Sequence, residues 1–382
     1  MTPALHIGIN ALYMIPGQVG GTEIYLRSLL AALASIDREN HYWVFTNRET
    51  GPDLIPVTSN FHHAPQPVNA TFRPGRIAWE QTGLVWRASA QQLDALFNPG
   101  FTAPVIASCP QVTVFHDLQH KRQPENFRWF DLPFWRLLLW ASVHRSAHLL
   151  ADSEATRDDL LRYYRVAASK VTVAPLGVDP RFFEIGRARK PDTTRPFLLA
   201  VSTLHPHKNL DGLLRAFAEF RKERAEFRLV ITGLRGFFAR QLEELRDSLG
   251  LAGAVDFTGW IPREQLYGLF ARAHAFFYPS RFEGFGLPVL EALAAGIPTA
   301  CSNIQPVSGI AGGAALQFDP ASGAAFADAM RRVTLDDELR ARLVAAGPLR
   351  AGEFSWEKTA QITLDAIRAC TKARAESRPG RA

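Results

Sequence analysis

The stretch AFFYPSRFEGFGLPVLEA, residues 275–292, decides the fold of the second half of the chain. Its first four residues are apolar and aromatic, as in a buried strand, and a Pro-Ser pair ends that run. Gly284 and Gly286 follow in a turn where the backbone can approach a ligand closely. Pro288 suits the start of a new helix. The free N–H groups at such a helix start are suited to binding phosphate.

Two carboxylates flank this turn. Glu283 lies within it, and Glu291 lies about one turn into the predicted helix. Carboxylates in such positions can accept hydrogen bonds from sugar and ribose hydroxyls. A glutamate in a first helical turn is also favourable simply because of the helix dipole. The spacing by itself leaves both interpretations open.

The same succession of strand, turn and helix continues outward through the whole chain. Apolar runs that predict strands alternate with amphipathic helical runs, and this alternation is typical of parallel sheets covered by helices, the α/β class. The predicted strands are HIGIN, HYWVFTN, DALFNPG, VTVFHD, HLLADS and VTVAPLG, then PFLLAVS, FRLVITG, AVDFTGW, AFFYPS, IPTACS and AALQFDP.

A break near the middle of the chain divides this pattern into two halves. Residues 186–195 are charged, contain a proline and show no apolar face, so we predict a linker there. The halves, residues 1–185 and 196–353, predict two doubly wound domains. Because ligands of such sheets bind beyond the carboxyl ends of the strands, we expect the site in a cleft between the domains.

Composition excludes several classes of protein. Of 382 residues, 47% are hydrophobic and 21% charged, unlike a disordered chain, a collagen-like fibre or a coiled-coil rod. Three scattered cysteines exclude a disulfide scaffold and a cysteine-built zinc site, and they indicate a reducing cytosol. The N-terminus does not resemble a signal peptide, and no apolar run predicts a transmembrane helix. The net charge of +6 is small, so nucleic acid is not an expected partner.

The segment 127–150 is apolar, rich in tryptophan and punctuated by Arg128, Arg136 and Arg145. One interpretation is a helix that lies on a membrane surface. The favoured alternative is a helix packed against the N-terminal sheet, with its arginines extending outward. The polar basic tail, 374–382, is interpreted as a solvated end rather than as a membrane anchor.

The turn at 279–292 resembles the nucleotide-sugar site of the retaining glycosyltransferases of family 4, which have the GT-B fold. Further motifs of that family occur in its order and cover nearly the whole chain: Gly20-Gly21, His116-Asp117, 152–157, 176–179, 207–209, 257–260 and 354–356. The sequence around 114–120, with Trp79-Glu80, looks most like bacterial enzymes that build O-antigen or exopolysaccharide, often mannosyltransferases. The resemblance implies an acceptor domain, a donor domain over 196–353, and a C-terminal helix, 354–373, that crosses back to the first.

The resemblance also implies a donor site. Glu291 resembles the carboxylate that holds the ribose hydroxyls of the donor, and Glu283 resembles the one beside its sugar. Lys208 resembles the lysine that neutralises the diphosphate. A cation there favours the leaving group as the glycosidic bond breaks. The backbone of the turn and helix start supplies the remaining donor contacts at Gly284, Phe285, Gly286 and Leu287.

In the first domain the resemblance implies roles for two loops. Gly21, after Gly20, resembles the loop glycine near the diphosphate and the acceptor. His116 resembles the histidine that contacts the transferred sugar. A histidine that ends an apolar strand is also compatible with a core residue, and Asp117 either orients His116 or caps the turn. For Lys208, we favour phosphate binding over a structural role because a lysine at a helix start opposes the dipole.

Two departures from the family pattern stand out. Many relatives carry an arginine shortly before the lysine, whereas this chain has none between Ser202 and His207, and His207 is a candidate replacement for that charge. Relatives also often carry a glutamate where this chain has Gly309.

Taken together, these features predict a retaining hexosyltransferase. We expect mannose transfer from GDP-mannose to a glycan or lipid-linked glycan, without a resident cofactor or metal. The expected location is the cytoplasm, with peripheral contact at an anionic membrane. The alternatives are UDP-glucose or UDP-N-acetylglucosamine as donor, or a catalytically silent relative that binds a nucleotide sugar.

Overall fold

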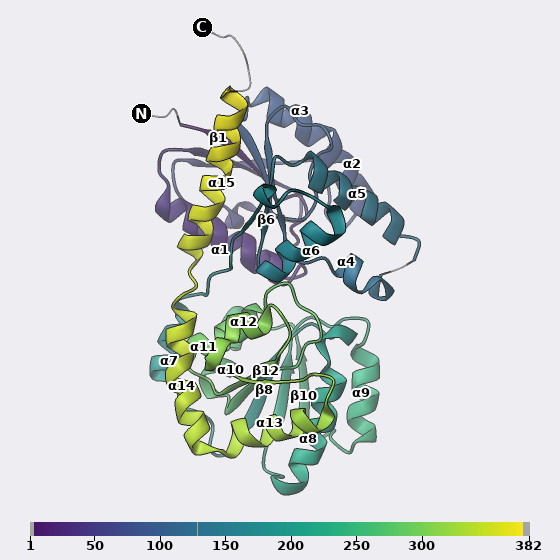
Figure 1. The fold of residues 1–382 in the computed structure, drawn as a ribbon, viewed down its shortest axis with the longest axis vertical. Helices are drawn as coiled ribbons and strands as arrows, with labels where there is room; N and C mark the ends of the chain where they lie inside the picture. Colours follow the sequence, from purple (N-terminus) through teal and green to yellow (C-terminus); the bar gives the residue numbers. More distant parts are fainter. Residues whose placement is uncertain (1–3, 128, 377–382) are drawn as a thin grey trace. The chain divides into compact units, whose positions relative to one another are not determined.

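The computed structural model describes residues 4–127 and 129–376, and the chain forms two compact units (Figure 1). The first unit contains the described residues up to Gly177 together with those from Trp356 onward, and the second unit is Val178–Ser355. Arg128 and the end of the predicted basic tail, 377–382, lie outside the described residues.

The first unit is built on a parallel sheet of seven strands, in the order β3-β2-β1-β4-β5-β6-β7. Six of these strands were predicted from the sequence, and the seventh, β3, was not. In this edge strand Phe61 and Ala64 are buried while His63 is exposed. The strands are β1 (His6–Asn10), β2 (His41–Thr46), β3 (Phe61–Pro65), β4 (Ala95–Asn98), β5 (Gln111–Phe115), β6 (His148–Ala151) and β7 (Val171–Val173).

The helices of the first unit follow the strands along the chain. Helix α1 buries the apolar face that runs from Leu26 to Leu33, and α15 lies along this helix, as Figure 1 shows. Thr359 Oγ1 on α15 donates a hydrogen bond to the carbonyl of Pro175, 2.5 Å away. The helices are α1 (Gly21–Ile36), α2 (Arg73–Gln81), α3 (Gly83–Ala90), α4 (Gln119–Arg122), α5 (Leu132–Arg145), α6 (Glu154–Tyr164) and α15 (Trp356–Glu376), with 3₁₀ turns η1 (Pro52–Leu54), η2 (Pro124–Asn126) and η3 (Ala168–Lys170).

The second unit is built on a parallel sheet of six strands, in the order β10-β9-β8-β11-β12-β13. All six coincide with predicted strands. In both units the chain starts near the middle of the sheet, builds outward, and then returns to add strands on the other side, so each sheet has a topological switch point beside its first strand. The strands are β8 (Phe197–Val201), β9 (Arg228–Thr232), β10 (Val255–Gly259), β11 (Ala275–Tyr278), β12 (Thr299–Ser302) and β13 (Leu316–Phe318).

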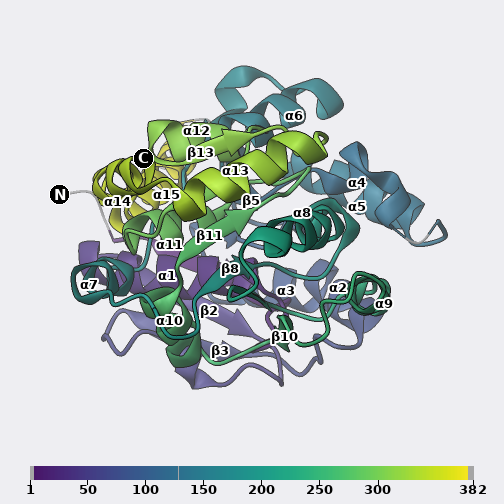
Figure 2. The same ribbon diagram turned by 90° about the horizontal axis from the view of Figure 1, so that it is seen from below.

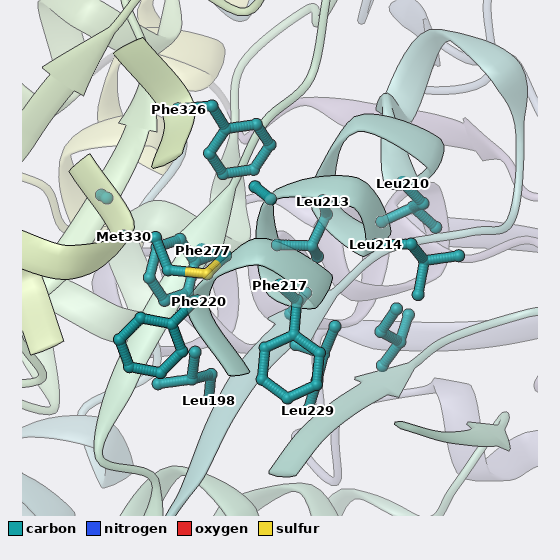
Figure 3. Close-up of a cluster of buried hydrophobic side chains, with 14 of the residues drawn as sticks. Leu198, Leu210, Leu213, Leu214, Phe217, Phe220, Leu229, Phe277, Phe326 and Met330 are labelled. Atoms are coloured by element: carbon teal, nitrogen blue, oxygen red, sulfur yellow. The ribbon is translucent and has the colours of Figure 1, made fainter. Parts of the chain in front are cut away.

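Apolar helix faces cover this second sheet. Leu213, Leu214, Phe217 and Phe220 of α8, which are spaced to lie on one helix face, are buried in its core (Figure 3). Helices α8 and α13 pack side by side (Figures 1 and 2). The helices are α7 (Arg181–Ala188), α8 (Leu210–Glu223), α9 (Ala239–Ser248), α10 (Arg263–Arg272), α11 (Leu287–Ala294), α12 (Val307–Ala311), α13 (Gly323–Leu335) and α14 (Asp337–Ala351), with 3₁₀ turns η4 (Pro206–Lys208) and η5 (Gly312–Ala314).

The segment predicted as a linker, 186–195, belongs to the second unit, so that prediction is wrong. Its first residues continue α7, whose Phe182 is fully buried, and its backbone at Lys190 and Asp192 donates hydrogen bonds to carbonyls at the end of α10. The apolar residue that anchors α7 lies before the charged stretch. The change of unit therefore comes earlier, after Gly177.

Helix α5 packs on the sheet as the favoured interpretation expects, but its exposed side differs from that expectation. Leu138, Leu139 and Val143 are buried, as expected for a helix packed on the sheet. Arg145 is exposed, as expected, but Arg136 is only partly exposed, and most of the outward side is aromatic: Phe134 is 56% exposed and Trp140 is 52% exposed. Within the described parts of the chain, no helix is both long enough and apolar enough to cross a membrane.

Candidate functional site

The turn that decides the fold connects β11 to α11 in the second unit. Gly286 caps α11 with φ of +116°, a conformation that glycine adopts far more readily than other residues. An added Cβ would also lie 3.3 Å from the side chain of Val307. Pro288 takes the second position of the helix. Phe285 and Leu287 are buried, so this predicted donor-binding turn is held by its own apolar side chains.

Lys208 and Glu283 form a buried ion pair beside this turn. Lys208 follows β8 and Glu283 follows β11, neighbouring strands at the switch point of the sheet. Their Nζ and Oε1 atoms are 2.7 Å apart, and the side chains are 15% and 10% exposed. Lys208 ends the short turn η4 rather than starting a helix, since α8 begins at Leu210. The helix-dipole argument for phosphate binding by Lys208 therefore does not apply. Its ion pair with Glu283 gives this lysine a structural contact within the protein.

The ion pair decides the protonation of Glu283. Burial by itself raises the pKa of this carboxyl group, but the charge and hydrogen bond of Lys208 outweigh it, and the pKa lies below its usual value. Asn209, next in the chain, holds the surrounding loops: its Nδ2 donates to the carbonyls of Pro279 and Pro320, each 3.1 Å away. Glu283 is therefore ionised at neutral pH and held in place.

Glu291 has a cationic partner that the sequence did not reveal. Its side chain is 3% exposed, and its Oε1 lies 3.0 Å from Nη2 of Arg263 at the start of α10. Arg263 also lies 3.4 Å from Asp179 and donates to the hydroxyl of Tyr267. Burial raises the pKa of Glu291, and the guanidinium offsets only part of that effect. Asp179 lies in one of the quoted motifs, 176–179, whereas nothing in the sequence marked Arg263.

His205 and His207 precede Lys208. The rings of these two histidines stack, with their centroids 5.8 Å apart. Burial and the neighbouring Lys208 charge lower the pKa of His207 to about 4, so this side chain is neutral at pH 7. The expectation that His207 replaces the charge of a missing arginine is wrong for this reason. At the other departure from the family pattern, the carbonyl of Gly309 accepts a 2.7 Å hydrogen bond from Arg350.

The predicted site residues of the first unit lie after β1 and β5. Gly20 caps α1 with φ of +60°, and no described atom lies within 4 Å of the position that a Cβ on Gly21 would take. Open space of this kind is compatible with the predicted approach of a ligand. Asp117 caps the following turn by accepting a 2.8 Å hydrogen bond from the backbone of Gln119.

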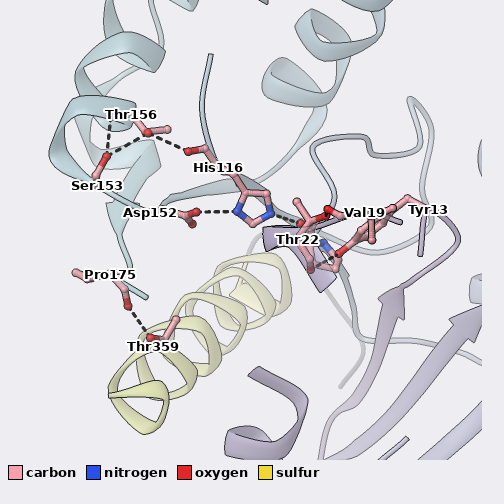
Figure 4. A network of polar contacts seen from close by, with 10 residues as sticks. Tyr13, Val19, Thr22, His116, Asp152, Ser153, Thr156, Pro175 and Thr359 are labelled. Carbon is pink, nitrogen blue, oxygen red and sulfur yellow. Dashed lines mark hydrogen bonds and ion pairs between the residues drawn. The ribbon is translucent and has the colours of Figure 1, made fainter. Parts of the chain in front are cut away.

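His116 is held at both ring nitrogens (Figure 4). Its Nδ1 lies 2.7 Å from Asp152 Oδ2, and its Nε2 lies 2.8 Å from the carbonyl of Pro99. A carboxylate and a carbonyl both accept hydrogen bonds, so this geometry favours a ring with a proton on each nitrogen, the imidazolium. Burial lowers the pKa of His116, but the Asp152 charge and these hydrogen bonds raise it above its ordinary value. Asp152, the first residue of the motif 152–157, is thus the residue that orients His116.

This arrangement limits the chemistry of His116. An imidazolium whose two N–H groups are already donated to the protein has no nitrogen free to accept a proton. It can contribute a fixed positive charge and the edge of its ring. Among residues 4–127 and 129–376, no group of three or more His, Cys, Asp or Glu side chains is arranged to hold a metal ion. The expected independence from a metal, like the expected cleft between the domains, stays a prediction.

Comparisons with known proteins agree with this arrangement. The family described as glycosyltransferase family 4 matches residues 19–182, and the family described as glycosyl transferases group 1 matches residues 182–350. O-antigen chain mannosyltransferase B of Escherichia coli is 29% identical over 265 residues, which are 67% of this chain and 70% of that protein. O-antigen chain mannosyltransferase RfbU of Salmonella typhimurium is 28% identical over 232 residues, 61% of this chain and 62% of the relative.

Among solved structures, sucrose-phosphate synthase from Thermosynechococcus elongatus superposes with a TM-score of 0.78. The match has 19% sequence identity and covers 97% of this chain and 100% of that one. At this identity the likeness shows the fold, two Rossmann-like domains of the GT-B class. The two family matches follow one another along the sequence and adjoin at residue 182. The chain therefore belongs to the glycosyltransferases that combine a family 4 domain with a group 1 domain.

Proposed function

We propose that this glycosyltransferase transfers mannose from GDP-mannose to a glycan or lipid-linked glycan acceptor during synthesis of a cell-surface polysaccharide. The observation that carries the donor site is the pair of buried carboxylates in the second unit, each held by its own cation. The names of the two O-antigen mannosyltransferases favour mannose as the sugar. UDP-glucose and UDP-N-acetylglucosamine are the alternative donors.

The donor roles follow from the chemistry of these groups. Glu291 is rigidly placed, and its carboxylate accepts hydrogen bonds from the ribose hydroxyls of the nucleotide. The free N–H groups of the first turn of α11 and the Lys208 ammonium stabilise the diphosphate, whose negative charge grows as the glycosidic bond breaks. Glu283 keeps Lys208 in place, and its carboxylate accepts hydrogen bonds from hydroxyls of the transferred sugar.

The proposed reaction retains the configuration at the anomeric carbon of the transferred sugar, and no protein side chain attacks that carbon. Glu283 is ionised, but its Oε1 is engaged by Lys208, and His116 has no nitrogen free to act as a base. These observations support a front-face reaction in which the acceptor hydroxyl attacks on the side of the leaving diphosphate, which takes up its proton. No resident cofactor or metal is required in this scheme.

The donor assignment is tested by calorimetric titration with GDP, UDP, ADP and their sugar conjugates. Glu291→Gln and Lys208→Met are the test variants, and Arg240→Gln, an exposed position on α9, is the matched control. We expect GDP-mannose to bind tightest and both test variants to lose that affinity. Product anomers identified by NMR, with and without EDTA, test retention and metal independence. Binding of GDP-mannose without turnover would instead indicate the silent relative, and tighter binding of a UDP-sugar would overturn the mannose assignment.

Peripheral contact with an anionic membrane is also part of this proposal. The observation in its favour is the aromatic side of α5 and the segment before it, where Trp129, Phe130, Phe134, Leu137 and Trp140 are exposed. The exposed cation Arg145 is the last residue of α5. Aromatic rings beside basic groups suit the interface of a bilayer that carries negative lipids.

The membrane contact is tested by flotation with vesicles of phosphatidylglycerol and phosphatidylethanolamine. We expect the wild type to float, Phe134→Ser/Trp140→Ser to stay in solution, and Leu349→Ser, an exposed apolar position on α14, to behave as wild type. Recovery of all three proteins in solution would argue against a cytoplasmic enzyme attached to the inner membrane face.

A further inference from the structure

Helix α2 of the first unit carries a buried cation without a partner. The side chain of Arg76 is only 7% exposed. Its Nε is shielded from solvent and has no hydrogen-bond partner. Among the described residues, no carboxylate lies within ion-pair distance of this guanidinium. A buried guanidinium without a counter-ion is costly, because charged groups lose their hydration when they leave water.

Glu80, one helical turn along α2, does not serve as that partner. Its Oε2 accepts hydrogen bonds from Asn10 Nδ2 at 3.1 Å and Thr102 Oγ1 at 2.8 Å, and its Oε1 accepts one from Gln81. Burial raises the pKa of Glu80, although the Arg76 charge acts in the opposite direction. The carboxylate is thus engaged in fixing the end of β1 and the loop after β4, and it acts on Arg76 only through its charge, without a direct ion-pair contact.

The surroundings of Arg76 are those of a ligand site. Asn10 and Asn98 end β1 and β4, the strands at the switch point of this sheet, where open α/β sheets bind their ligands. The pKa of Tyr13, in the loop after β1, is lowered by the charge of Arg76 and raised by the charge of Asp152. Asp152 is 4% exposed, and its Oδ1 has no hydrogen-bond partner. This edge of the sheet therefore offers both an unpaired cation and an unpaired carboxylate oxygen.

We propose that Arg76 binds an oxyanion, a phosphate or carboxylate group, carried by the sugar acceptor. A guanidinium recognises either group through two parallel hydrogen bonds, and such a contact supplies the missing counter-charge. The free Oδ1 of Asp152 suits a hydroxyl of the same acceptor. The inference rests on the proposed function because it describes the second substrate of that reaction. It predicts that the acceptor is an anionic rather than a neutral sugar.

The test compares three probes on the full chain: glucose 6-phosphate, glucuronate and neutral methyl glucoside. Saturation-transfer NMR at low salt measures their affinities. We expect one anionic probe to bind at least about tenfold more tightly than the neutral one, a difference that sodium chloride reduces. Preference for the phosphate or for the carboxylate identifies the oxyanion. Equal affinity for all three probes in the wild type overturns the proposal without the need for any variant.

Variants separate binding from folding. Arg76→Gln should lose the preference for the anionic probe, whereas Arg73→Gln, an exposed arginine on the same helix, should retain it. Arg76→Gln removes a buried charge without a direct ion pair but also the charge that offsets the burial of Glu80, so its unfolding temperature should stay close to that of the wild type. A lower unfolding temperature with unchanged probe binding would show a structural role and overturn the proposal.

A separate GDP titration distinguishes this inference from the donor assignment. Arg76→Gln should bind GDP as the wild type does. Loss of GDP affinity would mean that Arg76 serves the donor, which overturns the acceptor assignment. Failure of the wild type to bind any nucleotide would refute the proposed donor site and leave the anionic-probe result to be judged by itself.

Discussion

Replacing Asp152 with asparagine should change how stability depends on pH. The substitution keeps the shape of the side chain but removes the charge beside His116 Nδ1, 2.7 Å away. An asparagine amide can donate to Nδ1, while a proton on Nε2 still donates to the carbonyl of Pro99. The variant should therefore keep the geometry of the ring but hold it as a neutral imidazole instead of an imidazolium.

The sign of the effect follows from the two folded-state pKa values. In the wild type the pKa of His116 is raised, so its stabilising contribution is complete below the unfolded value of about 6.5 and is lost as pH rises through the folded pKa. In Asp152→Asn, burial without a carboxylate lowers the pKa of His116. The variant then loses stability as pH falls below about 6.5. The difference in unfolding free energy between the two proteins is thus largest at acidic pH.

The geometry sets the size of the difference. The side chains of His116 and Asp152 are 11% and 4% exposed, so solvent screens the pair weakly. Breaking a buried ion pair costs about 3–5 kcal/mol. Since the amide keeps one hydrogen bond, we expect Asp152→Asn to lower the free energy of unfolding by about 3 kcal/mol at pH 5.5. For a unit of this size, that lowers the unfolding temperature by about 6–12 °C. The loss should be much smaller at pH 8.5.

The assay is urea unfolding of both proteins between pH 5.5 and 8.5, combined with ¹⁵N chemical shifts of the His116 ring. Asp117, whose charge also acts on the pKa of His116, is present in both proteins, and the pKa of Tyr25 is raised far above this pH range. A difference that does not change with pH would refute the reasoning. A wild-type ring with a single proton at pH 7 would do the same.

Three further changes act on the second unit. Lys208→Met should cost about 3–5 kcal/mol of unfolding free energy by leaving Glu283 buried without a partner, and a double variant with Glu283→Gln should recover much of the loss in urea unfolding. Arg263→Met should raise the pKa of Glu291 further, so nucleotide affinity measured by calorimetry should fall as pH is lowered from 8 to 6; an affinity that is flat over this range would count against the ribose role. Gly286→Ala should lower the unfolding temperature through strain of about 1–3 kcal/mol at its positive φ, whereas Gly323→Ala, at an open helix start, should not.

Several parts of this fold could be predicted from residue pattern. Parallel strands are short apolar runs that end at Gly, Pro, Asn or Asp, and twelve such runs were identified and confirmed. The buried face of α8 from Leu213 to Phe220 can also be recognised in the sequence, because the spacing of its apolar residues matches the period of a helix. The missed strand, β3, is an edge strand with two histidines in its middle, and its buried residues do not alternate along the chain. The misplaced linker shows that a charged stretch can be anchored by a single apolar residue upstream, Phe182.

The sequence by itself determined the fold class, the turn around Gly286 and the candidate carboxylates, since these depend on local propensity and spacing. Only the tertiary structure decided which charges are paired. Lys208 with Glu283, Arg263 with Glu291 and His116 with Asp152 join residues that lie between 28 and 75 positions apart. The partner and protonation state of each group depend on burial and on neighbours supplied by other strands and helices, and no local pattern encodes them. The unpaired charge of Arg76 became visible for the same reason.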